Sequence, residues 1–208
     1  LLCRFQKEFG IDEVTFHKRT PIAREKAKVD ALVRSGAVLC VGADVKADFI
    51  ALGHTPKYDD AEALERATVV IDCTPAGNAN KAKIYDNLKG PKGFIAQGSE
   101  FGFGKMYARG INDSTLVPGK DRFIQVVSCN THNLSRVVKC ITNDGRGRLN
   151  LKNGRFLLLR RANDISQDSS FIPSPQVGGH GDPRFGTHHA RDAFHLFGTM
   201  GQEPNLFS

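Results

Sequence analysis

The sequence contains no apolar run that approaches the length of a membrane-spanning helix. It also lacks the basic, apolar and small-residue order of a secretory signal peptide. We therefore expect a protein without a membrane partner. Hydrophobic residues make up 40% and charged residues 25% of the 208 positions, a balance typical of an ordinary globular protein with ample core.

Patterns of paired cysteines are also missing. The five cysteines include no Cys-x-x-Cys pair, their number is odd and they lie far apart. This spacing argues against a secreted disulfide framework and favours a reducing compartment, so we expect a cytoplasmic protein. No cysteine or carboxylate stands at metal-ligand spacing from the paired histidines near the end of the sequence, and we predict no metal site.

The formal net charge is +7 and the sequence pI is near 9.3. Such an excess suits either nucleic acid or a small anionic ligand. The basic residues are scattered, and the sequence has neither zinc-finger spacing nor an aromatic-basic RNA-binding motif. This distribution favours small phosphorylated ligands over nucleic acid.

Short apolar strands alternate with helices over the first part of the sequence. We expect strands at 12–17, 37–41, 68–73 and 93–97, and helices at 22–35, 46–52, 62–67 and 80–88. This alternation predicts an α/β fold with a Rossmann-type, parallel, doubly wound sheet. Such a sheet normally opens with a strand, whereas residues 1–9 have helical spacing. We therefore expect the first strand to be missing upstream, and both ends look cut.

The composition of the sequence changes after residue 98, where a basic, loop-rich segment begins. We expect a strand at 122–127, a helix at 131–142, a strand at 155–161 and an extended loop at 172–186. We predict a domain boundary at the end of the first of these strands. Residues 1–128 would form a nucleotide-binding domain truncated at its N-terminus, and 129–208 the start of an α+β catalytic domain truncated at its C-terminus.

Cys129 stands where the strand 122–127 turns into a helix, in "VVSCNTHNLSR". The unpaired N–H groups and positive dipole end of a helix N-terminus stabilise a thiolate and a developing oxyanion. A cysteine there is well placed to attack a carbonyl, and its neighbours Ser128, Asn130 and Thr131 could orient a substrate. The alternative interpretation is a small buried residue that fills a tight turn.

Two further pairs suggest anion binding. Arg160 and Arg161 close the expected strand 155–161, and the guanidinium fork suits phosphate, although a solvated pair next to Asp164 is the alternative. His188 and His189 follow the extended loop. They could contact a phosphate, bind a metal or lie on the surface without a function, and we rank the metal last.

Lys18, Arg19 and Thr20 follow the strand 12–17, where a dinucleotide-binding fold meets the adenine ribose. An acidic residue there selects the free 2′-hydroxyl, whereas basic residues accept a 2′-phosphate. No carboxylate ends the strand, so the segment favours NADP over NAD. A solvated basic turn is the alternative.

The motifs "VIDCTPAG", "AQGS", "VVSCNT" with "LSR", "LLLRRA", "IPSP" and "THH" occur in this order. Together they resemble the archaeal-type, or type II, phosphorylating glyceraldehyde-3-phosphate dehydrogenase over nearly the whole chain. The resemblance implies that Cys129 is the nucleophile. It implies a substrate and phosphate site formed by Ser128, Asn130, Thr131, Arg160, Arg161, His188 and His189. It implies cofactor contacts from Lys18, Thr20, Thr74, Pro75, Gly98 and the adjoining Ser99, which replaces a glycine of the family.

The sequence also departs from the family pattern. The Gly-x-Gly-x-x-Gly turn that cradles the pyrophosphate is absent, and the family's catalytic histidine would lie beyond Ser208. "FIAQGSEF" replaces the family's Phe-Gln-Gly-Gly-Glu-Lys run, and His132 and Asn133 replace a Thr-Gly pair. These differences indicate a divergent branch, and we expect the 208 residues alone to be inactive.

The resemblance implies an oxidoreductase that converts glyceraldehyde 3-phosphate and inorganic phosphate to 1,3-bisphosphoglycerate. The reaction would run through a cysteine thiohemiacetal and thioester with NADP, or NAD, in a homotetramer of the full-length protein. Two alternatives stay open. One is another cysteine-dependent semialdehyde or aldehyde dehydrogenase of the same fold, and the other is a non-enzymatic, basic Rossmann-like binding module.

Overall fold

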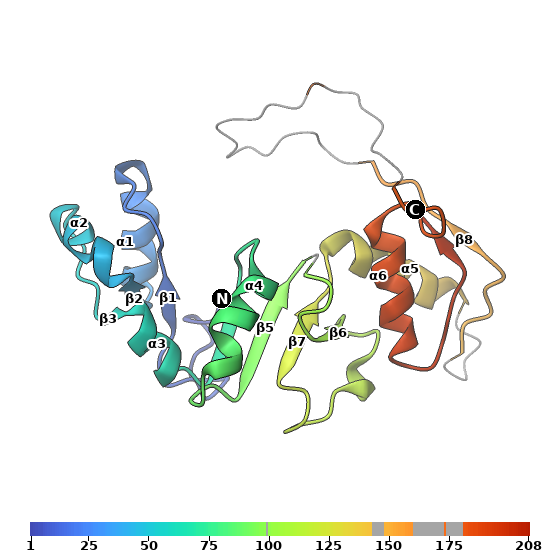
Figure 1. The fold of residues 1–208 in the computed structure, drawn as a ribbon, viewed down its shortest axis with the longest axis horizontal. Coiled ribbons are helices and arrows are strands. Elements are labelled where there is room, and N and C mark those ends of the chain that lie inside the picture. The colour runs from blue at the N-terminus through green and yellow to red at the C-terminus, as the bar shows by residue number, and fades with distance from the viewer. Residues whose placement is uncertain (99, 143–147, 160–172, 174–180) are drawn as a thin grey trace. The chain divides into compact units, whose positions relative to one another are not determined.

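The computed structural model describes residues 1–98, 100–142, 148–159, 173 and 181–208. These residues form two compact units (Figure 1). The first unit comprises residues 1–70 and 87–92, and the second comprises 71–86 and 93–208. The functional boundary expected after Ser128 stays a prediction.

The first unit contains a three-stranded parallel sheet in the order β1-β2-β3. Its strands are β1 (Thr15–His17), β2 (Val38–Val41) and β3 (Tyr58–Asp59). Its helices are α1 (Lys26–Arg34), α2 (Lys46–Ala51) and α3 (Asp60–Arg66), with the 3-10 turns η1 (Ala23–Glu25) and η2 (Ala43–Val45). Leu39 and Val41 of β2 pack against Val29 of α1 and Phe49 of α2, which explains why this short apolar strand lies at the centre of the unit.

The second unit contains a four-stranded sheet in the order β4-β5-β7-β6. Its strands are β4 (Val69–Asp72), β5 (Gly93–Gln97), β6 (Lys105–Tyr107) and β7 (Phe123–Val126), and β7 is parallel to both of its neighbours. The other elements are α4 (Gly77–Lys83), η3 (Tyr85–Asn87), η4 (Asp113–Thr115), α5 (Cys129–Thr142), β8 (Gly154–Arg155), α6 (His188–Gly198) and β9 (Leu206–Phe207). Parallel strands with connecting helices confirm the predicted α/β class and are consistent with a Rossmann-type fragment.

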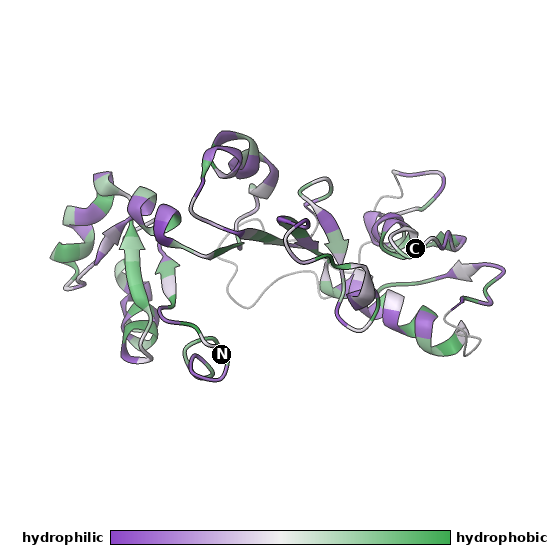
Figure 2. Ribbon diagram, turned by 90° about the horizontal axis from the view of Figure 1, so that it is seen from below, coloured by the Kyte–Doolittle hydropathy of each residue, from purple (hydrophilic) through white to green (hydrophobic). Residues whose placement is uncertain are grey.

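The core of the second unit lies between α5, α6 and β6. Leu134 and Val138 of α5 meet Leu196 and Phe197 of α6, and Met106 of β6 joins them. Both helices mix apolar and polar residues along their length (Figure 2), as expected for helices with one buried face. This packing fixes the N-terminal turns of α5 and α6, which carry the candidate site. Within the described residues, no helix combines the length and the apolar character needed to cross a bilayer.

Two expected elements differ from the structure. The strand predicted at 155–161 is represented only by β8, and residues 156–159 form no strand. Residues 157–159 belong to a continuous apolar run that pairs with no strand in the described part of the chain, and Leu157 and Leu159 are 89% and 90% exposed. Residues 1–9 form hydrogen-bonded turns, including Phe9 N to Phe5 O at 3.0 Å, instead of a continuous helix.

Candidate functional site

Cys129 is the first residue of α5, and two residues separate it from the end of β7. Ser128 precedes it, and the backbone N–H of Thr131 donates a 3.2 Å hydrogen bond to the Ser128 hydroxyl oxygen. Serine is a favoured N-cap because its oxygen satisfies one of the free N–H groups of the first turn. The thiol is exposed, so the interpretation of Cys129 as a small buried residue is wrong.

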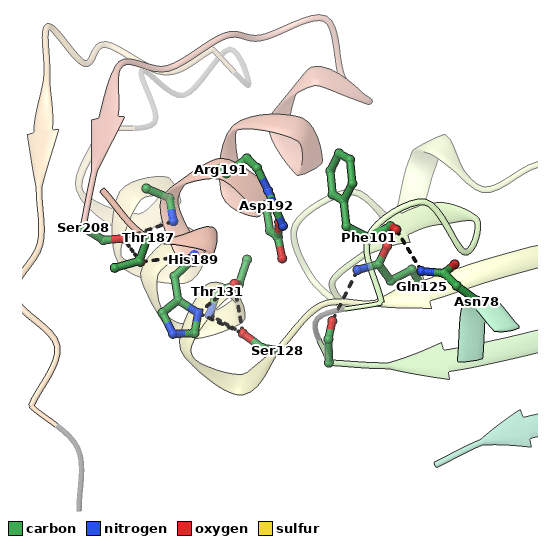
Figure 3. Close-up of polar contacts among 12 residues, drawn as sticks. Asn78, Phe101, Gln125, Ser128, Thr131, Thr187, His189, Arg191, Asp192 and Ser208 are labelled. Carbon is green, nitrogen blue, oxygen red and sulfur yellow. Dashed lines mark hydrogen bonds and ion pairs between the residues drawn. The ribbon is translucent and has the colours of Figure 1, made fainter. Parts of the chain in front are cut away.

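A hydrogen-bonded group of side chains joins the first turns of α5 and α6 (Figure 3). The Ser128 hydroxyl lies 3.2 Å from Nδ1 of His189 and donates to the Thr131 hydroxyl at 2.9 Å. The Asn130 amide nitrogen lies 3.5 Å from Nε2 of the same imidazole. Three predicted site residues from α5 and its cap therefore gather around His189. We call Ser128, Asn130, Thr131 and His189 the His189 cluster.

The position of His189 follows from the start of α6. Thr187 is the N-cap, and its hydroxyl accepts a 3.3 Å hydrogen bond from the His189 N–H. Ser208 lies beside this cap, because its hydroxyl is 2.6 Å from the Thr187 hydroxyl and accepts from Ala190 N at 3.2 Å. Two helix N-termini thus meet at the His189 cluster. Paired positive dipole ends of this kind suit an anion.

The neighbouring His188 is partly exposed, whereas His189 is buried, and the two rings lie 3.9 Å apart. No group of metal-binding side chains occurs among the residues that the structure describes. Arg160, Arg161 and Ser99 lie outside the described residues.

The predicted cofactor residues of the second unit follow its strands. Thr74 and Pro75 come after β4, and the Thr74 N–H donates to the Asp72 carboxylate at 2.7 Å. Gly98 follows β5 with φ of +83°, and a Cβ there would meet open space. Ligands of open parallel sheets bind beyond the carboxyl ends of the strands, so these positions fit a dinucleotide.

In the first unit, Lys18, Arg19 and Thr20 follow β1, as predicted. Lys18 donates a hydrogen bond to the carboxylate of Glu25 and pairs with it. This hydrogen bond and the lysine charge lower the pKa of Glu25. Sequence reasoning missed Glu25 because it belongs to η1, not to the end of the strand.

Sequence reasoning also missed an open depression of about 640 Å³ at the exposed thiol. Its lining includes Cys129, Arg109, Gly110, Asp113, His132 and Arg136, and we call it the Cys129 depression. Arg136 occurs in the "LSR" motif, but nothing in the sequence relates it to Arg109 in a distant turn.

A buried carboxylate lies on α6. Asp192 is fully buried, and its Oδ1 accepts hydrogen bonds from Arg191 Nε at 3.0 Å and Nη2 at 2.9 Å. The Arg191 guanidinium lies 4.5 Å from the ring centre of Phe101 (Figure 3). Burial raises the pKa of Asp192, and the hydrogen bonds from Arg191 offset part of this effect. Oδ2 of Asp192 has no hydrogen-bond partner among the described residues.

The fold and the site together describe an α/β protein with an exposed cysteine at a strand-to-helix junction, where the N-termini of two helices meet. No family model matches the chain. The chain is 31% identical over 119 residues to glyceraldehyde-3-phosphate dehydrogenase 1 of Methanosarcina barkeri, which covers 55% of the chain and 34% of that protein. It is 32% identical over 137 residues to glyceraldehyde-3-phosphate dehydrogenase of Methanothermus fervidus, covering 63% and 37%.

The enzyme of the same name from Pyrobaculum neutrophilum is 28% identical over 130 residues, covering 59% of the chain and 36% of the relative. The resemblance to archaeal glyceraldehyde-3-phosphate dehydrogenases, first indicated by the motifs, is confirmed by these matches. The matched part of the chain spans about a third of the length of these curated relatives.

Proposed function

We propose that the chain forms part of a phosphorylating aldehyde dehydrogenase that acts on glyceraldehyde 3-phosphate with NADP, or NAD. The observation that carries this proposal is the meeting of the N-termini of α5 and α6 at the His189 cluster, whose Ser128 and Asn130 flank the exposed Cys129 in the sequence. The similarity to archaeal enzymes that bear this name supports it.

Cys129 is the proposed nucleophile. Its thiolate attacks the aldehyde carbon, and the N–H groups of the first turn of α5 stabilise the oxyanion that forms. The bound dinucleotide supplies the acceptor for the hydride that leaves this carbon. Cys129 then holds the product as a thioester, and attack by inorganic phosphate releases the acyl phosphate and restores the thiolate. We propose no general base among the described residues for these steps.

The His189 cluster is the proposed contact for the substrate. His188 lies on the same helix turn. Arg160 and Arg161 join this phosphate site on the strength of the sequence resemblance alone.

NADP is the proposed cofactor because Arg19 follows β1 together with Lys18 and Thr20. The pairing of Lys18 with Glu25 leaves Arg19 as the basic side chain of the segment that makes no ion pair within the described residues. Thr74, Pro75, Gly98 and Ser99 are the proposed contacts nearer the nicotinamide. By the same resemblance, we propose a cytoplasmic homotetramer.

The test is cofactor reduction by the protein expressed from its complete reading frame. Glyceraldehyde 3-phosphate, inorganic phosphate and either NADP or NAD are supplied. Reduction should depend on phosphate and vanish in Cys129→Ser, whereas Cys140→Ser, which removes another exposed thiol of α5, should keep the rate. An unchanged rate in Cys129→Ser would remove the proposed nucleophile.

The two alternatives give different results in the same series. Faster turnover of aspartate semialdehyde than of glyceraldehyde 3-phosphate would move the proposal to another aldehyde dehydrogenase. No reduction, together with steeply salt-dependent binding of RNA or DNA, would favour the non-enzymatic module.

A further inference from the structure

The Cys129 depression combines residues from α5 and from the turn that follows β6. Arg136 lies on α5 and Arg109 on the turn, and both guanidinium groups line the depression with the exposed thiol. Neither guanidinium group makes a hydrogen bond or an ion pair within 4.0 Å with any residue that the structure describes, although the charge of Arg109 acts on Asp113. The N–H groups of both side chains are therefore available to a ligand.

Hydrogen bonds fix the turn against α5. The imidazole of His132 donates from Nε2 to the Arg109 carbonyl oxygen at 2.9 Å, because a carbonyl can only accept. The Lys139 ammonium donates to the carbonyl oxygens of Gly110 and Ile111 at 2.8 and 2.9 Å. The backbone that carries Arg109 is thus attached to the helix that carries Cys129.

Gly110 makes room for the second arginine. Its φ is +78°, and a Cβ at this position would lie 2.4 Å from Nη1 of Arg136. Glycine therefore serves two needs here, a left-handed backbone and the close approach of a guanidinium.

The charges of the lining favour an anion. Asp113 opposes the two arginines, but the Tyr107 hydroxyl and the Gly110 N–H donate to its two oxygens, each at 2.6 Å. The hydrogen bond from Tyr107 lowers the pKa of Asp113, so this carboxylate is ionised at neutral pH. Two guanidinium groups against one carboxylate leave the lining net positive.

We propose that Arg109 and Arg136 form an anion subsite that holds a phosphoryl group beside Cys129. The proposal rests on the proposed function for the identity of the anion, which is the phosphate of the aldehyde substrate or free inorganic phosphate. The planar fork of each arginine matches the oxygens of a phosphate. This subsite is separate in its residues from the His189 cluster and from Arg160 and Arg161.

The test compares the alkylation rates of Cys129 by anionic iodoacetate and by neutral iodoacetamide, followed by peptide mass spectrometry, on the protein from its complete reading frame. A positive subsite accelerates the anionic reagent selectively. The ratio of the two rates should fall roughly two- to fivefold in Arg109→Gln and in Arg136→Gln, and it should fall in the wild type as salt is raised. Arg184→Gln is the matched control, because Arg184 packs over Phe185 and Phe194 of the same unit and lies outside the Cys129 depression.

Further variants separate charge from geometry. Arg136→Lys keeps the charge and should keep the iodoacetate preference, yet it should weaken protection of Cys129 by phosphate. Gly110→Ala keeps every charge but displaces the Arg136 guanidinium, and it should also weaken this protection. Circular dichroism checks that each variant retains the fold.

Protection by inorganic phosphate alone would assign the subsite to the attacking phosphate. Stronger protection by glycerol 3-phosphate would assign it to the phosphate of the substrate. An iodoacetate preference that is the same in the wild type, both Arg→Gln variants and the control would overturn the proposal. The alkylation rates need no dehydrogenase activity, so loss of the subsite and failure of the proposed reaction are distinguishable.

Discussion

The hydroxyl of Ser128 lies 3.2 Å from Nδ1 of His189, although 61 positions separate the two residues in the sequence. Ser128 is the residue before α5, and His189 belongs to the first turn of α6. The contact brings two helix N-termini together beside an exposed thiol. The Ser128-Cys129 pair that follows β7 thus gives both a helix cap and an exposed thiol.

Replacing Ser128 by alanine should lower the free energy of unfolding by about 1–2 kcal/mol. The change removes the acceptor for the Thr131 N–H and the partner of His189. Urea unfolding measures the difference. Ser35→Ala, at the end of α1, removes only an exposed hydroxyl that donates to the Ala31 carbonyl, and it should change the free energy much less. Equal effects of the two substitutions would contradict the capping role.

Cys129 should be alkylated first among the five cysteines at neutral pH, and Cys40 last. Cys129 is exposed at a helix N-terminus, whereas burial and the nearby Asp60 charge raise the pKa of the Cys40 thiol to about 11. Timed labelling with iodoacetamide and peptide mass spectrometry give the order. Cys40 should stay a protonated thiol up to about pH 10 and label only as the pH nears 11 or the chain unfolds. Equal rates at Cys129 and exposed Cys140 would remove the argument from the helix terminus.

Asp72→Asn should destabilise the protein by about 1–3 kcal/mol at pH 7. Burial opposes ionisation of Asp72, but hydrogen bonds from Asn80, Thr74 and Tyr85 outweigh it and lower the pKa of this carboxyl. A lowered pKa stabilises the folded state above the unfolded value near 4, and the contribution is lost as the pH falls through the folded value.

The difference between wild type and Asp72→Asn should therefore shrink below about pH 4. Urea unfolding from pH 7 down to pH 3 measures it. Asp86→Asn, a change at an exposed carboxylate beside Tyr85, is the control and should show little difference at any pH. A difference that grows on acidification would contradict the assigned direction of the pKa.

Glu25→Gln should raise the affinity for NADP relative to NAD, by up to about fivefold. The substitution releases the Lys18 ammonium from its ion pair, next to the segment proposed to meet the 2′-phosphate. Dissociation constants of both cofactors, measured by calorimetry on the protein from its complete reading frame, give the ratio. Glu13→Gln frees Lys57 from a similar ion pair in the first unit, which also contains Glu25, and it should leave the ratio of the two dissociation constants unchanged. A lower NADP preference in Glu25→Gln would contradict the proposed role of the segment.

Local signals made much of the fold predictable. The apolar run of β2 and the turn from β7 into α5 are marked in the sequence by residue type and spacing. The strand expected at 155–161 was marked by an apolar run as well, but a strand also needs a partner, and within the described residues only Arg155 of this run belongs to one.

The candidate site, too, could be predicted only in part from the sequence. The Ser-Cys-Asn-Thr run and the paired histidines could be singled out in the sequence, and the fold brings Ser128 to His189. Arg109 could not be found, since its place beside Arg136 depends on a turn held by His132 and Lys139 and on the missing side chain of Gly110. Glu25 was missed for a similar reason, because its contact with Lys18 bridges a loop.

The most direct test of the account is a single-turnover experiment without inorganic phosphate, on the protein from its complete reading frame. Glyceraldehyde 3-phosphate and NADP are mixed with the protein, and cofactor reduction and the mass of the Cys129 peptide are followed together. The account predicts a burst of reduced cofactor equal to the concentration of active sites and an acyl adduct on Cys129. When phosphate is added, the adduct should be released and turnover should resume. Reduction without any adduct on Cys129, or an adduct on another residue, would contradict it.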